Sequence, residues 1–253
     1  MNFGELFNRT GLIAAHRGAR SIAPENTLRA LSASVGECDF IEIDVQLSSD
    51  GVVIVMHDDT LERTTNVCEM ENYKNREPYN VSDFTLKELL SLDYGGWFDG
   101  KFEPLLTLTQ ALRFVKENMM FLNIEIKDMN HFFSDEKVVS SVLQEVEDLH
   151  AQELVMFSSF RHEYLPLCKE KLPDIPTAAL IENLHPDDLI PYLIALHVNA
   201  YHMNDELADK ETVQQLRDEG FFVSVYTIND PLRAKELFAM GVNGIFTDIL
   251  SLY

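Results

Sequence analysis

Cysteine and long hydrophobic runs are scarce in this sequence, and their scarcity excludes several classes of protein. The 253 residues include three cysteines, Cys38, Cys68 and Cys168, and no C-x-x-C pair. An odd number of widely spaced cysteines argues against a disulfide framework and against a structural zinc site. No run of ~18 consecutive apolar residues occurs, and the first residues lack the basic and apolar regions of a signal peptide. We therefore expect a cytoplasmic protein without membrane insertion.

Positive charge is also scarce. The chain has 20 lysines and arginines against 42 acidic residues, which gives a formal net charge of -22. Such a surface repels nucleic acid, so we expect no nucleic-acid partner. An acidic protein that handles a phosphate group needs a small site in which cations are concentrated. Hydrophobic residues make up 46% of the chain, which is enough for an ordered globular core.

Short apolar runs typical of β-strands alternate with amphipathic helical patterns along the whole chain. The predicted strands are residues 12–16, 40–45, 121–126, 154–158, 177–181, 199–202, 221–227 and 244–247. The predicted helices are residues 27–35, 108–117, 136–149, 161–170, 187–196, 210–218 and 232–240. Parallel strands need long crossover connections, so this alternation indicates a parallel sheet. Eight such units in about 250 residues predict an α/β fold, the (β/α)8 TIM barrel, with an open doubly wound sheet as the alternative.

One long segment interrupts this alternation after the second predicted strand. Residues 46–106 far exceed the ~2–6 residues of an ordinary connection between a strand and a helix. They begin with two alternating runs around Ser-Asp-Gly, a pattern that predicts a β-hairpin. We therefore predict a single domain, residues 1–253, with a small inserted lobe at about 46–106 on the active-site face. The chain ends too soon after Thr247 for a full eighth helix, so either residues 3–9 cover that face or it stays partly open.

Charged and imidazole side chains stand at the ends of the first three predicted strands. They are His16, Arg17, Glu42, Asp44, Glu125 and Lys127. Residues two apart on a strand face the same side, so Glu42 points with Asp44, and Glu125 points with Lys127. If the hairpin turns near residues 49–50, His57 folds back roughly opposite Glu42. The sequence therefore predicts one cluster of these side chains at the carboxyl ends of the strands.

Three carboxylates in this cluster, Glu42, Asp44 and Glu125, lack an equal number of basic partners. Mg²⁺ and Ca²⁺ prefer oxygen ligands, and we expect one divalent cation, Mg²⁺ or Ca²⁺, on these three residues. A Glu-x-Asp pair on a strand can also be half of a salt-bridge network. Burying so many charges together without a function is costly, which favours the metal site.

The remaining members of the cluster suit phosphate chemistry. Arg17 and Lys127 supply the local positive charge that binds a phosphate group. His16 and His57 offer a general acid and a general base near neutral pH. Together with the carboxylates, they predict metal-assisted phosphoryl transfer.

These residues also resemble the glycerophosphodiester phosphodiesterase family. The matching strings are His16-Arg17-Gly18, Pro24-Glu25-Asn26-Thr27, Glu42-x-Asp44, His57-Asp58, Glu125-x-Lys127, Val225-Tyr226-Thr227-Ile228-Asn229 and Gly241-Val242-Asn243-Gly244-Ile245-Phe246-Thr247-Asp248. In this order they span nearly the whole chain. The resemblance implies a (β/α)8 barrel with a small inserted lobe, and hydrolysis of glycerophosphodiesters to sn-glycerol 3-phosphate and an alcohol.

The resemblance also implies roles for the clustered residues. The carboxylates match the family's metal ligands, His16 and His57 match its acid/base pair, and Arg17 and Lys127 match phosphate-contacting positions. In the implied mechanism, the substrate's own glycerol hydroxyl attacks phosphorus while one histidine takes its proton. The other histidine protonates the leaving alkoxide, and water then opens the cyclic phosphate. Holding an internal nucleophile in line removes the entropy of recruiting an external one.

Two aromatic residues complete the predicted substrate site. Phe160 follows the fourth predicted strand and is expected to line the mouth of the pocket. Tyr226 stands where the family commonly has Trp, and it is expected to form an apolar wall for the glycerol or the leaving group. The departure affects substrate preference more than activity.

Several other polar residues are expected to be structural. Asn26 or Thr27 is expected to cap the first predicted helix. Glu25 could support the site from behind it, but capping and packing are expected to be its larger role. Asp58 is expected to be solvated. His202, at the end of the sixth predicted strand, could face the site, but a hydrogen-bonded core histidine is the favoured expectation.

Three alternative functions remain. A lysophospholipase D of the same fold would carry an exposed apolar rim on the inserted lobe, where residues 69–77 are instead polar. A catalytically silent barrel could bind phosphate ligands, but both histidines and all three carboxylates are present. A sugar-processing barrel could use paired carboxylates, but a neutral sugar needs no phosphate clamp. We therefore favour a small soluble glycerophosphodiester as the binding partner, with the alcohol and the oligomeric state left open.

Overall fold

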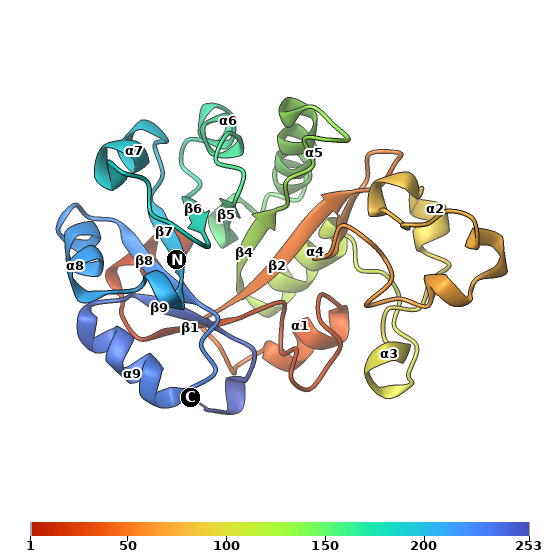
Figure 1. The fold of residues 1–253 in the computed structure, drawn as a ribbon, viewed down its shortest axis with the longest axis horizontal. Helices are drawn as coiled ribbons and strands as arrows, with labels where there is room; N and C mark the ends of the chain where they lie inside the picture. The colour runs from red at the N-terminus through yellow and green to blue at the C-terminus, as the bar shows by residue number, and fades with distance from the viewer. Residues whose placement is uncertain (1, 253) are drawn as a thin grey trace.

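The computed structural model describes residues 2–252, whose strands form one continuous sheet (Figure 1). The strands are β1 Leu12–Ala15, β2 Phe40–Leu47, β3 Val53–Val55, β4 Phe121–Ile126, β5 Val155–Ser159, β6 Thr177–Ile181, β7 Ala200–Asn204, β8 Phe222–Tyr226 and β9 Gly244–Thr247. Strand β1 pairs in parallel with both β2 and β9, which closes the sheet. The described residues therefore contain an eight-stranded parallel barrel. This confirms the (β/α)8 prediction and excludes the open sheet.

Helices connect the strands and lie outside the barrel (Figure 1). They are α1 Leu28–Ser34, α2 Leu86–Leu89, α3 Gly96–Asp99, α4 Leu108–Asn118, α5 Asp135–Asp148, α6 Tyr164–Lys171, α7 Leu189–Ala195, α8 Lys210–Asp218 and α9 Pro231–Met240. Thr27 caps α1 by accepting a hydrogen bond from the Ala30 backbone nitrogen. Within residues 2–252, no helix is both long enough and apolar enough to cross a membrane.

Successive side chains along each strand point alternately to two separate apolar clusters. In β2, Ile41 and Ile43 belong to the apolar layer between the strands and the outer helices. Phe40 belongs to a second cluster with Phe121, and this cluster fills the amino-terminal half of the barrel. Glu42 and Asp44 follow Phe40 at intervals of two, so they point into the barrel nearer its carboxyl end. The two-residue repeat of the strand therefore places these polar side chains near the carboxyl end of the barrel, where barrel enzymes have their active sites.

The N-terminal 3-10 helix, η1 Phe3–Asn8, closes the amino-terminal end of the barrel. The ring of Phe3 lies 5.4 Å from that of Phe40 and 5.5 Å from that of Phe121, both edge to face. Phe7 stacks on Phe222 at 4.5 Å. Of the two alternatives left open for the face without an eighth helix, the one in which residues 3–9 cover it does not hold. These side chains are aromatic, and they fill the interior between the strands.

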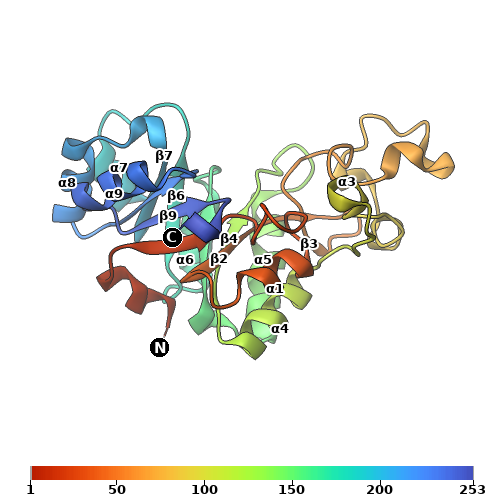
Figure 2. The same ribbon diagram turned by 90° about the horizontal axis from the view of Figure 1, so that it is seen from below.

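The long segment after β2 begins with the predicted hairpin and continues into a lobe at one side of the barrel (Figures 1 and 2). Strand β3 pairs antiparallel with β2, with Val45 opposite Val55. Continuing that register sets His57 opposite Ile43, one residue from the predicted partner Glu42. The lobe has its own apolar cluster, which includes Leu61, Phe84 and Leu92.

Candidate active site

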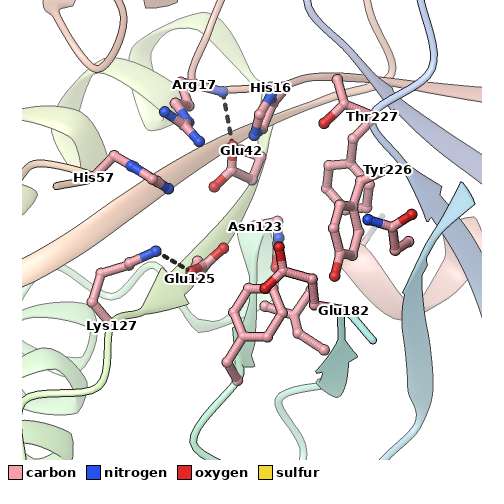
Figure 3. A pocket seen from close by; sticks show the side chains of 14 residues that line it. His16, Arg17, Glu42, His57, Asn123, Glu125, Lys127, Glu182, Tyr226 and Thr227 are labelled. Carbon is pink, nitrogen blue, oxygen red and sulfur yellow. Dashed lines mark hydrogen bonds and ion pairs between the residues drawn. The ribbon is translucent and has the colours of Figure 1, made fainter. Parts of the chain in front are cut away.

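A cavity of about 540 Å³ opens at the carboxyl ends of the barrel strands (Figure 3). It is lined by His16, Arg17, Glu42, His57, Asn123, Glu125, Lys127, Phe160, Leu180, Glu182, Asn204, Tyr226, Thr227 and Phe246. Among the described residues predicted for the site, all except Asp44 line this cavity. Asp44 lies buried behind it, where the side-chain nitrogen of Asn26 donates a 2.8 Å hydrogen bond to its Oδ2.

Three carboxylates converge at the floor of the cavity. Strands β2 and β4 pair with Asp44 opposite Glu125, which brings the two side chains together, and Glu42 lies two residues earlier on β2. One carboxylate oxygen from each of the three residues lies within 4.8 Å of the others. This donor set consists of oxygen only, and it fits a hard divalent cation such as Mg²⁺ or Ca²⁺.

Protonation within this carboxylate cluster is uneven. Burial, reinforced by the charges of Asp44 and Glu125, raises the pKa of Glu42 well above its ordinary value. Burial acts in the same direction on Asp44, but Lys127 and Arg17 outweigh it and hold the pKa of Asp44 well below its usual range. The charges of Asp44 and Glu125 contribute to this shift, so the three carboxylates repel one another despite the neighbouring cations. A bound divalent cation would supply the missing positive charge.

Arg17 and Lys127 are the cations beside this cluster. The ammonium of Lys127 lies 2.8 Å from Glu125 Oε1 and 3.6 Å from Asp44 Oδ1. Burial alone lowers the pKa of Lys127, but the charges of Glu125 and Asp44 raise it above its ordinary value, so the ammonium stays charged. The guanidinium Nε of Arg17 lies 3.5 Å from Asp44 Oδ2. The two positive groups thus face the same cavity as the carboxylates, as predicted.

The turn after β1 aims the backbone of Arg17 at the cluster. Arg17 and Gly18 both have positive φ, 56° and 78°. A Cβ at Gly18 would lie 2.8 Å from the backbone of Ala30, so this position requires glycine. The result is a 2.7 Å hydrogen bond from the Arg17 backbone N–H to Glu42 Oε2. A non-glycine residue in this conformation costs about 1–3 kcal/mol and is typical of functional sites.

Each predicted catalytic histidine has an aspartate on its Nδ1. His16 Nδ1 lies 2.8 Å from Asp248 Oδ1, and His57 Nδ1 lies 2.6 Å from Asp58 Oδ1. Figure 3 places the two imidazoles on either side of Glu42. Burial raises the pKa of Asp58, but its hydrogen bonds with His57 and Arg63 hold it well below the usual range. Asp58 is therefore part of the site, and the expectation that it is merely solvated is wrong.

The opposite wall of the cavity carries the two predicted aromatic residues. The rings of Phe160 and Tyr226 meet edge to face at 6.0 Å. The Tyr226 hydroxyl donates a 2.5 Å hydrogen bond to the carbonyl of Ile181, which fixes the ring against the wall. Glu182 and Asn204 also line the cavity, but they were not predicted from the sequence. Both lie at the carboxyl ends of strands, the same position that identified the other site residues.

His202 is fully buried, and neither of its ring nitrogens has a hydrogen-bond partner among the described residues. Its ring lies 5.0 Å from that of Phe246, at the floor of the cavity. The expectation of a hydrogen-bonded core histidine is therefore wrong. Burial lowers the pKa of His202 to about 3, so the ring is neutral near pH 7.

The chain is similar over nearly its whole length to phosphodiesterases of one family. The sequence model of the Glycerophosphoryl diester phosphodiesterase family matches residues 16–251. A glycerophosphodiester phosphodiesterase of Bacillus altitudinis is 32% identical over 243 residues, which cover 93% of this chain and 94% of that protein. One of Caldanaerobacter subterraneus subsp. tengcongensis is 31% identical over 243 residues, which cover 94% and 93%. The structure of an Oleispira antarctica phosphodiesterase with its product sn-glycerol-3-phosphate is similar with a TM-score of 0.86 and 28% identity, covering 96% of this chain and 95% of that one.

Proposed function

The chain belongs to the glycerophosphoryl diester phosphodiesterase family and is an enzyme of that class. We propose that it hydrolyses soluble glycerophosphodiesters to sn-glycerol 3-phosphate and an alcohol. One observation carries the proposal. Two imidazoles, two cations and two carboxylates line the same cavity, and the third carboxylate of the cluster, Asp44, lies directly behind it. A phosphodiester needs proton transfer at two oxygens and positive charge around phosphorus, and this cavity offers both.

In the proposed reaction, Glu42, Asp44 and Glu125 hold one divalent cation, Mg²⁺ or Ca²⁺. Their oxygen-only donor set and the raised pKa of Glu42 support this assignment. When bound, such an ion neutralises negative charge on the phosphoryl oxygens. Arg17 and Lys127 add positive charge on the same side of the cavity and bind the phosphate oxygens.

The two histidines exchange protons with the substrate. One accepts the proton of the substrate's glycerol hydroxyl as its oxygen bonds to phosphorus, and the other donates a proton to the alcohol oxygen as the bond from that oxygen to phosphorus breaks. Water then opens the cyclic phosphate, with the same two side chains restoring their protons. The Nδ1 contacts of His16 and His57 with aspartates support these roles, because they leave each Nε2 for the substrate.

Other parts of the chain serve this reaction by shaping the cavity. Phe160 and Tyr226 form the wall against which the organic part of the substrate packs. His57 comes from the hairpin that begins the inserted lobe. We therefore propose that residues 1–253 act as one catalytic domain, with the lobe at about 46–106 as part of the active unit.

The direct test is release of glycerol 3-phosphate from glycerophosphocholine and glycerophosphoethanolamine by the purified protein. Assays run with EDTA, with Mg²⁺ and with Ca²⁺. We expect turnover that depends on the ion, and a loss of roughly 10²- to 10⁴-fold in kcat for His16→Ala or His57→Ala.

His131→Ala is the matched control, since His131 is exposed and lies outside the cavity. We expect it to keep wild-type turnover. Folding of every variant is checked by its thermal melting curve. Absence of turnover with either ion in folded wild-type protein would contradict the proposed activity, and equal losses in the His131 control would contradict the assigned histidines.

A lysophospholipid is a second candidate substrate. Phe160 is 40% exposed and Leu184, two residues beyond the cavity wall at Glu182, is 75% exposed. These apolar side chains could receive an acyl chain. Turnover of lysophosphatidylcholine relative to glycerophosphocholine distinguishes the two substrates. We expect the soluble diester to be preferred, because Glu42, Lys127 and other polar residues line most of the cavity.

A further inference from the structure

The aspartates that hold the two histidines are themselves held by arginines. Arg20 Nη1 donates to Asp248 Oδ1 at 3.3 Å. Arg63 makes a two-pronged contact with Asp58, with Nε 2.5 Å from Oδ2 and Nη2 2.9 Å from Oδ1. A guanidinium bound at two points fixes the plane of a carboxylate as well as its position. Neither arginine lines the cavity, so both act on the site from behind it.

These arginines converge on one buried carboxylate. The side chain of Glu25 is 3% exposed. Arg20 Nη2 donates to its Oε2 at 2.8 Å, while Arg63 Nη2 donates to its Oε1 at 2.6 Å and Arg63 Nη1 to its Oε2 at 3.1 Å. Arg17 Nη1 also donates to Oε1, at 2.9 Å. Glu25 therefore joins the phosphate-binding arginine to both arginines behind the histidines.

The charge state of Glu25 fits this arrangement. Burial raises its pKa, but the hydrogen bonds and charges of Arg63, Arg17 and Arg20 outweigh burial and lower the pKa below its ordinary value. A buried ionised carboxylate persists only when its partners are in place. Glu25 therefore does more than the helix capping and packing expected from the sequence.

We propose that Glu25 is a positioning residue that sets the placement of the two catalytic histidines relative to each other, through the chain Asp248–Arg20–Glu25–Arg63–Asp58. The inference rests on the proposed roles of His16 and His57. These histidines come from different strands, and their aspartates come from positions far apart in the sequence. A shared anchor holds both imidazoles in the single geometry that proton transfer at two substrate oxygens requires.

Arg63→Ala is the principal test, because the Arg63 side chain is 43% exposed and its removal leaves an opening to solvent. With the Mg²⁺-loaded enzyme and glycerophosphocholine, we expect kcat to fall roughly 10- to 100-fold, the usual effect of losing a partner behind a catalytic ligand, with little change in KM. Added guanidinium ion, which can occupy that opening, should restore part of kcat. Arg63→Lys should retain more activity than Arg63→Ala, since it keeps one charged donor.

Arg76→Ala is the matched control. Arg76 lies in the same lobe, is 30% exposed and pairs with Glu88 at 2.7 Å, and it has no part in the cavity. We expect it to keep wild-type kcat. A kcat loss of the same size in both variants, without guanidinium rescue in Arg63→Ala, would mean general damage to the lobe and would overturn the proposal.

Combining Glu25→Gln with Arg63→Ala tests whether the arginine acts through Glu25. If it does, the double variant loses no more kcat than the larger single effect, because both changes break the same chain. If the fold-loss in kcat of the double variant equalled the product of the two single fold-losses, the two residues would act independently and the shared anchor would be overturned. Unchanged kcat in Arg63→Ala would overturn it as well.

Imidazole nitrogen NMR separates this proposal from the proposed activity. The wild-type spectrum should show His16 and His57 with the proton on Nδ1, and Arg63→Ala should shift the His57 signal while leaving unchanged that of His131, which is exposed and does not line the cavity. If the wild type hydrolyses no glycerophosphodiester but the spectra change in this way, the activity is wrong and the positioning role stands. If the His57 signal does not change, the positioning role is wrong.

Discussion

His202 is fully buried, its ring nitrogens have no hydrogen-bond partner within residues 2–252, and its pKa is strongly lowered. A histidine that titrates at about 3 in the folded protein stays neutral there, whereas the unfolded chain takes up a proton near pH 6.5. Between these two values the unfolded state binds more protons, so the contribution of His202 to stability falls as the pH falls. Above about pH 6.5 both states are neutral and the contribution is constant.

We expect the free energy of unfolding to fall more steeply with decreasing pH in the wild type than in His202→Leu. Each pH unit below about 6.5 contributes about 1.4 kcal/mol, so the wild type should lose about 2 kcal/mol more than the variant between pH 8 and pH 5. Denaturant unfolding at the two pH values measures this difference. Each protein is compared with itself at the two pH values, so the effect of the substitution on the free energy of unfolding at pH 8 cancels. Parallel pH dependence in the two proteins would show that the ring is solvated or paired in the folded state.

The histidine–aspartate pairs show where residue-level prediction stops. His16, His57 and the carboxylates were identifiable because they stand at strand ends, where a barrel gathers its functional residues. Asp248 also follows a strand and could have been found by the same rule. Arg63 carries no such signal. It lies in the lobe, and its partner Glu25 is 38 positions away, so only the folded chain reveals the contact.

At the scale of elements, the 3-10 helix η1 adds side chains to the apolar cluster that the strands form in the amino-terminal half of the barrel. Phe3 is 1% exposed and contacts Phe40 and Phe121 inside the barrel. Phe3→Ala should therefore open a cavity and destabilise the protein by about 3–5 kcal/mol. Denaturant unfolding measures the change. The opposite end of the barrel holds the active site, so turnover of the folded variant should be retained.

Phe102→Ala provides the comparison for this prediction, because Phe102 is 63% exposed. Its effect should stay within about 0.5 kcal/mol, the range of ordinary surface substitutions. Similar small effects for Phe3 and Phe102 would mean that η1 does not belong to the cooperative core.

Local patterns account for most of the elements that the structure contains. Each predicted barrel strand is present within residues 2–252, because parallel strands buried on both sides read as short apolar runs. Thr27 caps α1 as its side-chain chemistry predicts. The position of η1 could not be predicted, because it depends on a space formed by strands from the whole chain. The hairpin register was one residue off, because the turn residues do not fix the strand pairing by themselves.

At the scale of the whole molecule, the chain has a formal net charge of -22, and its site already contains three carboxylates, of which Glu42 and Asp44 are buried and Glu125 is half-buried. Both features disfavour additional negative charge and favour uptake of cations. In the absence of a metal, the raised pKa of Glu42 marks its ionised form as unfavourable in the folded protein. A divalent cation that binds the folded state and not the unfolded chain would therefore stabilise the fold by mass action.

Thermal unfolding in EDTA, in Mg²⁺, in Ca²⁺ and in NaCl of matched ionic strength tests this coupling. At an Mg²⁺ concentration of about 100 times Kd, the gain should be about 2.7 kcal/mol, or roughly 5–10 °C in Tm for a chain of this size. Glu42→Gln should abolish the Mg²⁺-dependent rise, yet match or exceed the wild type in EDTA, since it removes an uncompensated charge while keeping an acceptor for the Arg17 backbone. Glu182→Gln, which changes a cavity carboxylate outside the cluster, should keep the full rise. If neither Mg²⁺ nor Ca²⁺ stabilised the wild type more than NaCl of matched ionic strength, the ions would be acting only on the surface charge and the carboxylate cluster would not be a metal site.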